Sequence, residues 1–179
     1  CGTSPGAQQS GQTGQAGQEL PEPGAPATDD PSLRTLEAPL QTTLDTAQAA
    51  GVTGASTAVG GDGLELQVVG AECGVPGVRS EGYSVRAAGQ FCLVSVEAVN
   101  RGTAPVAFDP ARTALVDAEG GAAAPSPEAL ALPALAAVAA QVPGASALSG
   151  TLVFDVPAAA DVRALALDGQ ARAELPPLG

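Results

Sequence analysis

Residues 91–100 read FCLVSVEAVN, and this stretch decides the fold class. Cys92, Val94, Val96 and Ala98 occupy every second position, so in an extended chain they form one wholly apolar face. A period of two residues is typical of a strand that is buried on one side. We therefore expect a β-strand here, with Cys92 pointing into the core.

Runs of the same kind recur between turn signals along residues 62–179. They centre on Leu64, Leu66 and Val68, on Val106 and Phe108, on residues 114–116, on Leu152, Phe154 and Val156, and on the segments VRALAL and QARAEL. Asp168-Gly169 separates the last two segments, which is a strong hairpin signal. Six or seven short strands over this length predict an all-β domain built as a two-sheet sandwich.

The composition argues against several classes of function. The net charge is −12, with 19 acidic residues and seven basic ones, so the chain lacks the positive surface that binds phosphates of nucleic acids. There is no His, and every basic residue is Arg, which excludes Ser-His and Cys-His nucleophiles and Schiff-base lysines. Three Cys without His do not make a usual zinc site. We expect no enzyme activity, no cofactor, no metal and no nucleic-acid partner.

The N-terminal third has a different composition. Residues 1–30 are rich in Gly, Gln, Ser, Thr and Pro, and Leu20 is their only large apolar residue. Such a segment cannot bury enough apolar surface to offset the entropy lost on ordering. Residues 51–61 have linker composition as well. We assign residues 1–61 to a lipid-anchor cysteine and a low-complexity tether, and residues 62–179 to the folded domain.

Within the tether, residues 31–50 carry four leucines at helical spacing, namely Leu33, Leu36, Leu40 and Leu44. Pro39 stands in the middle of this pattern, and an interior proline costs a helix about 3 kcal/mol or more. We expect two short helical pieces or a mostly disordered linker here.

Cys1 is followed by Gly2, Thr3 and Ser4 and then by the polar tether. This start resembles the mature end of bacterial lipoproteins, in which an N-terminal cysteine carries a diacylglyceryl thioether after a signal peptide is removed. Two buried acyl chains give stable anchoring, whereas one is marginal. We expect an acylated Cys1 that holds the chain on the outer side of the cell membrane; the alternative is a free thiol at an arbitrary start.

The other two cysteines are Cys73 and Cys92. In an exported domain, two remaining cysteines most often pair, and a redox pair or metal ligands are the alternatives. Cys73 has the opposite parity to Leu64, Leu66 and Val68, so a strictly regular strand would point it outward. A bulge at Gly70 would restore its facing, and we expect a Cys73–Cys92 disulfide.

Residues 129–142 read ALALPALAAVAAQV and are almost wholly apolar. Pro133 suits the first position of a short helix. One interpretation is a helical or looped crossover packed on the sandwich. The other is an exposed apolar surface for a partner or for lipid, formed by Leu130, Leu132, Leu135 and Val138.

Two pairs of acidic residues stand at strand ends, Asp155 with Asp161 and Asp117 with Glu119. Either pair could bind calcium or act as a general acid and base. Carboxylates in turns more often accept hydrogen bonds from backbone N–H groups, and we favour that interpretation. Tyr83 is flanked by Arg79 and Arg86 in what reads as a Gly-rich loop, where the arginines suit either an anionic ligand or solvent.

Three segments together resemble a known family. They are GQFCLVSVEAVNRGTAPVAFD (residues 89–109), ALVDAEG (114–120) and VPGASALSGTLVFDVP (142–157). Their order resembles the domain-of-unknown-function family numbered 4352, over residues 62 to about 178. The resemblance implies an immunoglobulin-like β-sandwich of about seven strands on the outside of bacteria, often on a lipoprotein. It also supports the cysteine bridge, because actinobacterial members carry cysteines at similar positions.

The resemblance brings no catalytic residue or ligand, and the apolar stretch between residues 122 and 142 departs from the family pattern. We expect a cell-surface lipoprotein whose extracellular domain binds an unknown protein or cell-wall partner. A structural or accessory envelope role without a small ligand is one alternative. A carboxylate-dependent hydrolase that uses Asp155 is another.

Overall fold

The computed structural model of the chain describes Gly2, residues 30–44 and residues 56–178. Cys1 and most of the expected tether lie outside the described residues. The elements, in chain order, are β1 (Arg34–Thr35), β2 (Leu40–Thr43), β3 (Ser56–Val59), β4 (Leu64–Ser80), β5 (Tyr83–Asn100), β6 (Val106–Phe108), β7 (Thr113–Asp117), β8 (Ala122–Ala123), α1 (Pro127–Leu130), α2 (Pro133–Ala136), β9 (Ala140–Val142), β10 (Ser146–Val156), β11 (Val162–Leu167) and β12 (Ala171–Glu174).

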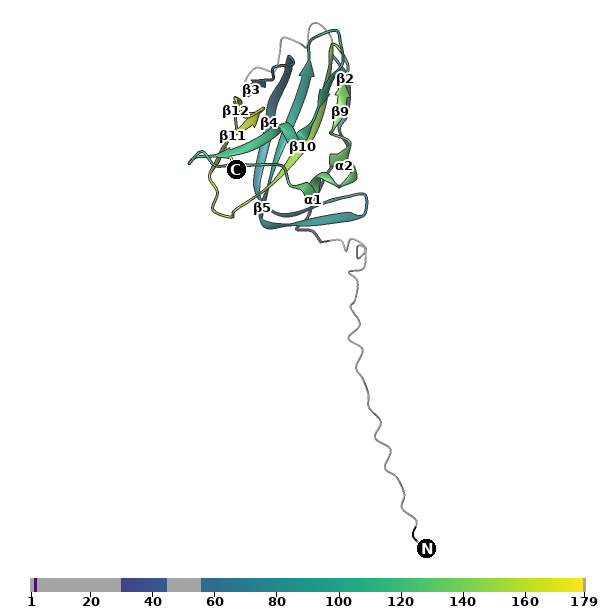
Figure 1. Ribbon diagram of the computed structural model, residues 1–179, viewed down its shortest axis with the longest axis vertical. Coiled ribbons are helices and arrows are strands. Elements are labelled where there is room, and N and C mark those ends of the chain that lie inside the picture. The colour runs from purple at the N-terminus through teal and green to yellow at the C-terminus, as the bar shows by residue number, and fades with distance from the viewer. Residues whose placement is uncertain (1, 3–29, 45–55, 179) are drawn as a thin grey trace.

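The large sheet is built on β4, β5 and β10, which pair antiparallel (Figure 1). Val94 lies opposite Leu152, and Cys92 lies opposite Phe154. These four side chains are buried, so the alternating apolar face expected from residues 91–100 is confirmed. β4 and β5 form one long hairpin that turns back at the lower end in Figure 1.

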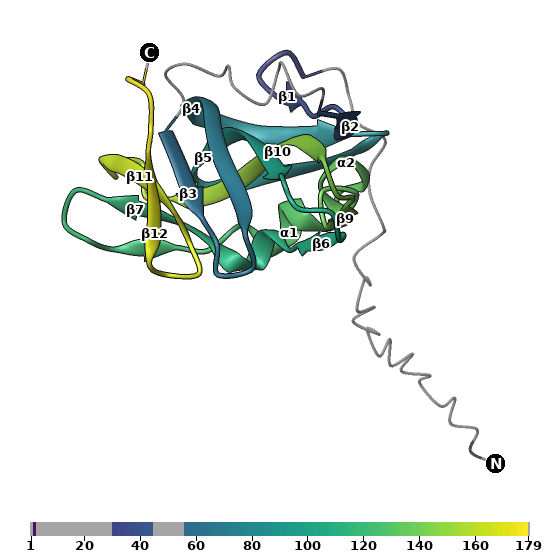
Figure 2. The same ribbon diagram turned by 90° about the horizontal axis from the view of Figure 1, so that it is seen from above.

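A second layer covers the inner face of this sheet. It contains the four-stranded sheet β12-β11-β7-β8, the two-stranded sheet β6-β9 and the two short helices (Figure 2). Leu115, Leu165 and Leu167 of this layer are buried in the same core cluster as Leu64 and Leu66 of β4. The expected β-sandwich is therefore confirmed. Residues 56–178 contain ten strands rather than about seven, because β3, β8 and β9 are too short to show a period of two.

Residues 30–44, here called the strap, are neither helical nor separate from the domain. β1 pairs with β4 in parallel, and β2 pairs with β10 antiparallel, so the strap reaches opposite edges of the large sheet (Figure 2). Leu33 and Leu36 are buried. Over residues 31–44, the expected short helices and the alternative of a disordered linker were both wrong, because the edges of β4 and β10 offer backbone hydrogen-bond partners to the strap.

The boundary between tether and domain also moves. β3 begins at Ser56 and pairs with β4 from Ser56–Val68 to Val59–Glu65. Ala58 of this strand is buried in the core. Residues 30–44 and 56–61 thus belong to the sandwich, and the assignment of all of residues 1–61 to a tether is corrected.

The apolar segment 129–142 forms the end of α1, all of α2 and β9, and it packs on the sandwich, which is the first of the two interpretations. Leu132, Leu135 and Val138 are at most 3% exposed, and Leu130 is half-buried against the core. The alternative of an exposed interaction surface at Leu130, Leu132, Leu135 and Val138 is corrected, because three of these side chains belong to the buried core cluster and Leu130 packs against it. Ser126 caps α1 by accepting a hydrogen bond from the Ala129 N–H.

The expected hairpin at Asp168-Gly169 is confirmed. Both residues have positive φ, 54° and 71°, and the Gln170 N–H donates to the Leu167 carbonyl. This is the backbone that tight hairpin turns require and that Asp and Gly tolerate. Glu81 and Gly82 make a similar turn at the tip of the β4–β5 hairpin, with φ of 49° and 86°.

Candidate functional site

The two domain cysteines join the neighbouring strands of the β4–β5 hairpin. The register shifts between Val68 and Gly70, so Val69 is an extra residue in β4. This bulge is the one expected from the sequence, and it turns the later part of β4 so that Cys73 faces the core side and bonds to Cys92. The predicted disulfide is thereby confirmed, and further register shifts follow on both sides of Val75.

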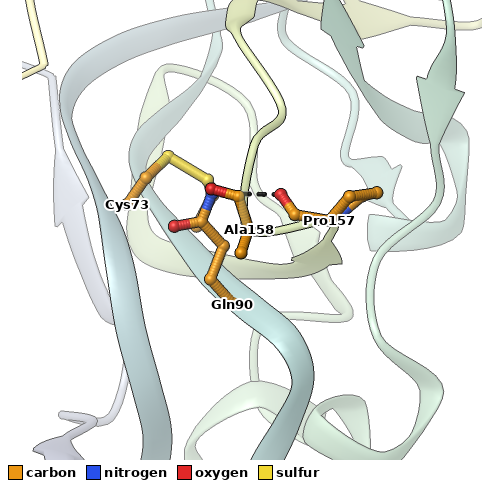
Figure 3. The surroundings of a disulfide bond; sticks show 5 residues. Cys73, Gln90, Pro157 and Ala158 are labelled. Carbon is orange, nitrogen blue, oxygen red and sulfur yellow. Dashed lines mark hydrogen bonds between the residues drawn. A yellow bond between two sulfur atoms is a disulfide. The ribbon is translucent and has the colours of Figure 1, made fainter.

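Beside the disulfide, Gln90 and Asp155 tie β5 to the end of β10. The Gln90 amide donates to the carbonyls of Pro157 (3.2 Å) and Ala158 (3.3 Å), as Figure 3 shows around Cys73. The Asp155 carboxylate accepts hydrogen bonds from the backbone N–H groups of Ala88 (2.7 Å) and Gly89 (3.1 Å). Asp155 therefore acts as a structural cap at this position.

The other acidic candidates have similar partners. Asp161 pairs with Arg163, and Asp117 accepts a hydrogen bond from the Gly121 N–H (2.6 Å) within its own turn. Across residues 30–44 and 56–178, no three His, Cys, Asp or Glu side chains come together as metal ligands would. The geometry gives Asp155, Asp161 and Asp117 the capping and pairing role that turn carboxylates commonly have.

The strap docks on the outer half of the hairpin through three arginines. Arg34 of the strap pairs with Glu72 of β4. In the other direction, Arg86 of β5 pairs with Asp30, and the Arg79 Nε donates to the Thr35 hydroxyl at 2.8 Å. Arg79 and Arg86 thus lie in paired strands that hold the strap, and the expected Gly-rich loop around Tyr83 is a hairpin.

Apolar contact reinforces these polar ones. Leu33 covers Gly77 so closely that a Cβ on this glycine would lie 2.6 Å from the leucine side chain. The Leu36 N–H donates to the Arg79 carbonyl at 2.8 Å. Hydrogen bonds from the Ser32 hydroxyl and N–H, together with Arg86, lower the pKa of Asp30 to about 2. The strap therefore begins at a fixed position, although sequence patterns indicated a linker.

A groove separates the strap from the outer face of the large sheet. Its lining combines small, hydroxyl, apolar and acidic side chains from the strap, β4, β5 and β10: Thr35, Leu36, Glu37, Gly70, Ala71, Glu72, Leu93, Ser95 and Thr151. No sequence pattern indicated this groove, because it exists only where the strap crosses three strands. A surface of this composition can contact a polypeptide or a glycan through hydrogen bonds and short apolar contacts.

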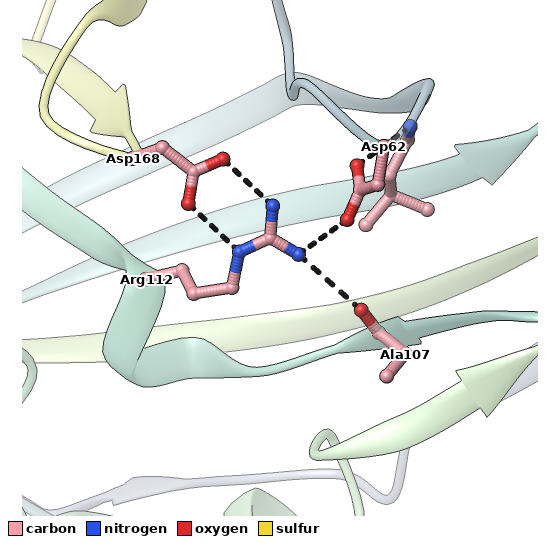
Figure 4. Close-up of polar contacts among 5 residues, drawn as sticks. Asp62, Ala107, Arg112 and Asp168 are labelled. Carbon is pink, nitrogen blue, oxygen red and sulfur yellow. Dashed lines mark hydrogen bonds and ion pairs between the residues drawn. The ribbon is translucent and has the colours of Figure 1, made fainter.

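At the other end of β4, Arg112 joins three separate segments (Figure 4). Its guanidinium holds both oxygens of Asp168 at 2.8 and 2.7 Å, and its third nitrogen contacts Asp62 at 2.6 Å. The same nitrogen reaches the Ala107 carbonyl at 3.4 Å. Hydrogen bonds from Arg112 lower the pKa values of Asp62 and Asp168, and the two carboxylates raise the pKa of Arg112. This cluster ties the turn before β4 to the turn between β11 and β12, and no sequence pattern indicated it.

Comparison with known proteins places residues 56–173 in one family. This segment matches the model described as Domain of unknown function (DUF4352). No curated protein and no solved structure matches the chain. In the described ranges, no helix has the length and apolar character needed to cross a bilayer. Because the match spans most of the chain and agrees with the motifs around Cys92 and Asp155, the protein belongs to the DUF4352 family of domains of unknown function.

Proposed function

We propose that the chain is a lipid-anchored, outward-facing surface protein whose sandwich binds a protein or cell-wall component without catalysis. The observation that carries the proposal is the Cys73–Cys92 disulfide inside the large sheet. Disulfides form and persist mainly in exported proteins, because thiols in the cytoplasm are kept reduced. The small residues and polar tether after Cys1 support acylation of that cysteine.

The chemistry of the described side chains favours binding over catalysis. The chain has neither His nor Lys to serve as a base or nucleophile near neutral pH. Asp155 and Asp117 are engaged by backbone N–H groups, and Asp62 and Asp168 by Arg112. The lowered pKa values of Asp62 and Asp168 keep these two carboxylates charged, and a charged carboxylate is a poor general acid.

Mass spectrometry of the native protein tests anchoring. We expect Cys1 to carry a diacylglyceryl group, and Cys73 and Cys92 to resist alkylation until they are reduced. A Cys1→Ser variant should leave the membrane fraction while it keeps the disulfide. An unmodified Cys1, or two titrating thiols in the folded native protein, would contradict the proposal.

The groove beside the strap is where we place the contact. Thr151 lines it and is half-buried, whereas Thr103 is exposed beyond the far end of β5. Thr151→Arg fills the groove, and Thr103→Arg makes the same chemical change away from it. Binding to purified cell-wall sacculi, and cross-linking to membrane proteins in cells, should fall with the first variant only. Equal loss or equal retention in both variants would argue against the groove.

A further inference from the structure

Tyr83 lies at an end of the domain that differs from the rest of its surface. The hairpin end is defined here as residues 30–35 and 72–86, which are the start of the strap and the outer half of the β4–β5 hairpin. Tyr83 sits beside the tip of this hairpin and is 63% exposed. The other aromatic side chains, Phe91, Phe108 and Phe154, are at most 2% exposed. Exposed tyrosine is favoured where an apolar layer meets water, as at lipid headgroups.

The charge of the hairpin end differs in the same way. It carries three of the seven arginines, Arg34, Arg79 and Arg86, and three of the 19 acidic residues, Asp30, Glu72 and Glu81. These charges balance, so the whole net charge of −12 belongs to the remainder of the chain. An anionic surface repels the remainder and tolerates this end.

The strap starts at Asp30, on the hairpin end of the domain. The Arg86–Asp30 ion pair and the burial of Leu33 fix the start of the strap on the hairpin. Residues 1–29 therefore join the domain at the hairpin end. A lipid on Cys1 would hold this end closer to the bilayer than the Asn100 end of β5.

From these three observations we propose that the hairpin end rests on the headgroup layer of the anionic membrane to which Cys1 is attached, with Tyr83 in the interface. The inference rests on the proposed acylation of Cys1. Because the lipid and the domain would belong to one chain, attachment raises the local concentration of the hairpin end at the membrane to the order of mM, so a weak contact is sufficient. The groove between the strap and the large sheet would then stay open to the side of the domain.

The chain contains one Tyr and no Trp, so its ultraviolet fluorescence reports Tyr83 alone. Acylated full-length protein would be placed in vesicles of phosphatidylcholine and phosphatidylglycerol. We expect acrylamide quenching to fall by about twofold or more relative to the Cys1→Ser protein in solution, as for an interfacial tyrosine, and nitroxide-labelled headgroups to quench the emission. Unchanged acrylamide quenching, with no effect of the nitroxide, would overturn the inference.

Flotation with the vesicles and the acyl mass on Cys1 keep the two proposals separate. Protein that fails to acquire lipid contradicts the anchoring, whereas protein that floats with a fully accessible Tyr83 contradicts only the membrane contact. Protection of Tyr83 in native membranes but not in lipid vesicles would also overturn a lipid partner and would indicate a protein instead.

Two matched substitutions test whether added negative charge at the hairpin end weakens its contact with an anionic membrane. Ser84→Glu adds a negative charge beside Tyr83, and Thr103→Glu adds one beyond the Asn100 end of β5; both positions are exposed. We expect Ser84→Glu to restore at least half of the acrylamide quenching in anionic vesicles and Thr103→Glu to leave it unchanged. Circular dichroism checks that both variants fold. Equal effects of the two variants would contradict an oriented contact.

Discussion

At the hairpin end, each ion pair joins one arginine to one carboxylate and is largely exposed to solvent. At the other end of β4, by contrast, Arg112 alone binds two carboxylates and a carbonyl. The Arg86 side chain is 62% exposed and Arg112 is 26% exposed. Exposed single pairs contribute little to stability, and bidentate, partly buried ones contribute more. The hairpin end must therefore depend on its disulfide, on Leu33 and on the adjoining Leu36 of the strap, and the opposite end on Arg112.

Removal of the disulfide should have the largest effect. In a Cys73→Ala, Cys92→Ala double variant, we expect the free energy of unfolding to fall by about 3 kcal/mol, because the bridge constrains the unfolded chain. Urea denaturation measures this loss. Reducing agent should lower the stability of the wild type to a similar degree and leave the double variant unaffected. A loss below about 1 kcal/mol in the double variant would show that the bulged hairpin is stable without the disulfide.

The strap offers a matched pair of leucines. Leu36 is 7% exposed and Leu40 is 68% exposed. We expect Leu36→Ala to cost about 2 kcal/mol and to speed hydrogen exchange at the Leu36 amide, because it removes buried apolar contact. Leu40→Ala should stay within about 0.5 kcal/mol of the wild type. Similar effects for both would mean that the strap is not anchored by burial.

Arg112→Gln should cost about 2 kcal/mol, since charged hydrogen bonds to two carboxylates are lost together. Arg172→Gln, on the exposed surface of β12, is the control and should change little. Thermal unfolding monitored by circular dichroism compares them. A loss as small as that of the control would show that Arg112 does not hold its three segments.

The same cluster predicts a pH dependence. Because the pKa values of Asp62 and Asp168 are lowered in the folded state, their contribution is complete above the unfolded value of about 4. It is lost as the pH falls from there through the lowered values. We expect wild-type stability to drop faster than that of Arg112→Gln in this acid range. Parallel curves in urea titrations at a series of pH values would contradict the assignment.

The smallest effect is expected for Arg86→Gln at the hairpin end. Its pair with Asp30 is exposed, so the loss should be under about 1 kcal/mol and should shrink further in high salt. Denaturation at low and high salt measures both. A loss of stability equal to that of Arg112→Gln would show that the ion pairs at the two ends contribute equally.

Much of the sandwich follows from local sequence patterns. The alternation through Cys92, Val94 and Val96 identified the buried face of β5. The Asp168-Gly169 turn required only the backbone freedom of those two residues. Even the bulge before Cys73 was predictable, because the parity of Cys73 conflicts with that of Leu64 to Val68. These features depend on neighbours a few residues apart.

Other features depend on partners that are distant in the sequence. Helical spacing relates Leu33, Leu36, Leu40 and Leu44. Residues 30–44 nevertheless contain the strands β1 and β2, because the edges of β4 and β10 were available for pairing. Likewise, the sequence allowed segment 129–142 to be either surface or core. In the structure most of its large apolar side chains are buried in the core of the sandwich.

The composition and periodicity of this chain thus determined an all-β domain, its main faces and its turns, and the number and placement of its cysteines favoured their pairing. The tertiary structure decided the strap, the groove and the Arg112 cluster. Arg112 lies 50 residues from Asp62 and 56 from Asp168, and the short strands β1 and β2 have too few residues to carry a period. Such contacts join residues that are far apart in the sequence, so no local pattern predicts them.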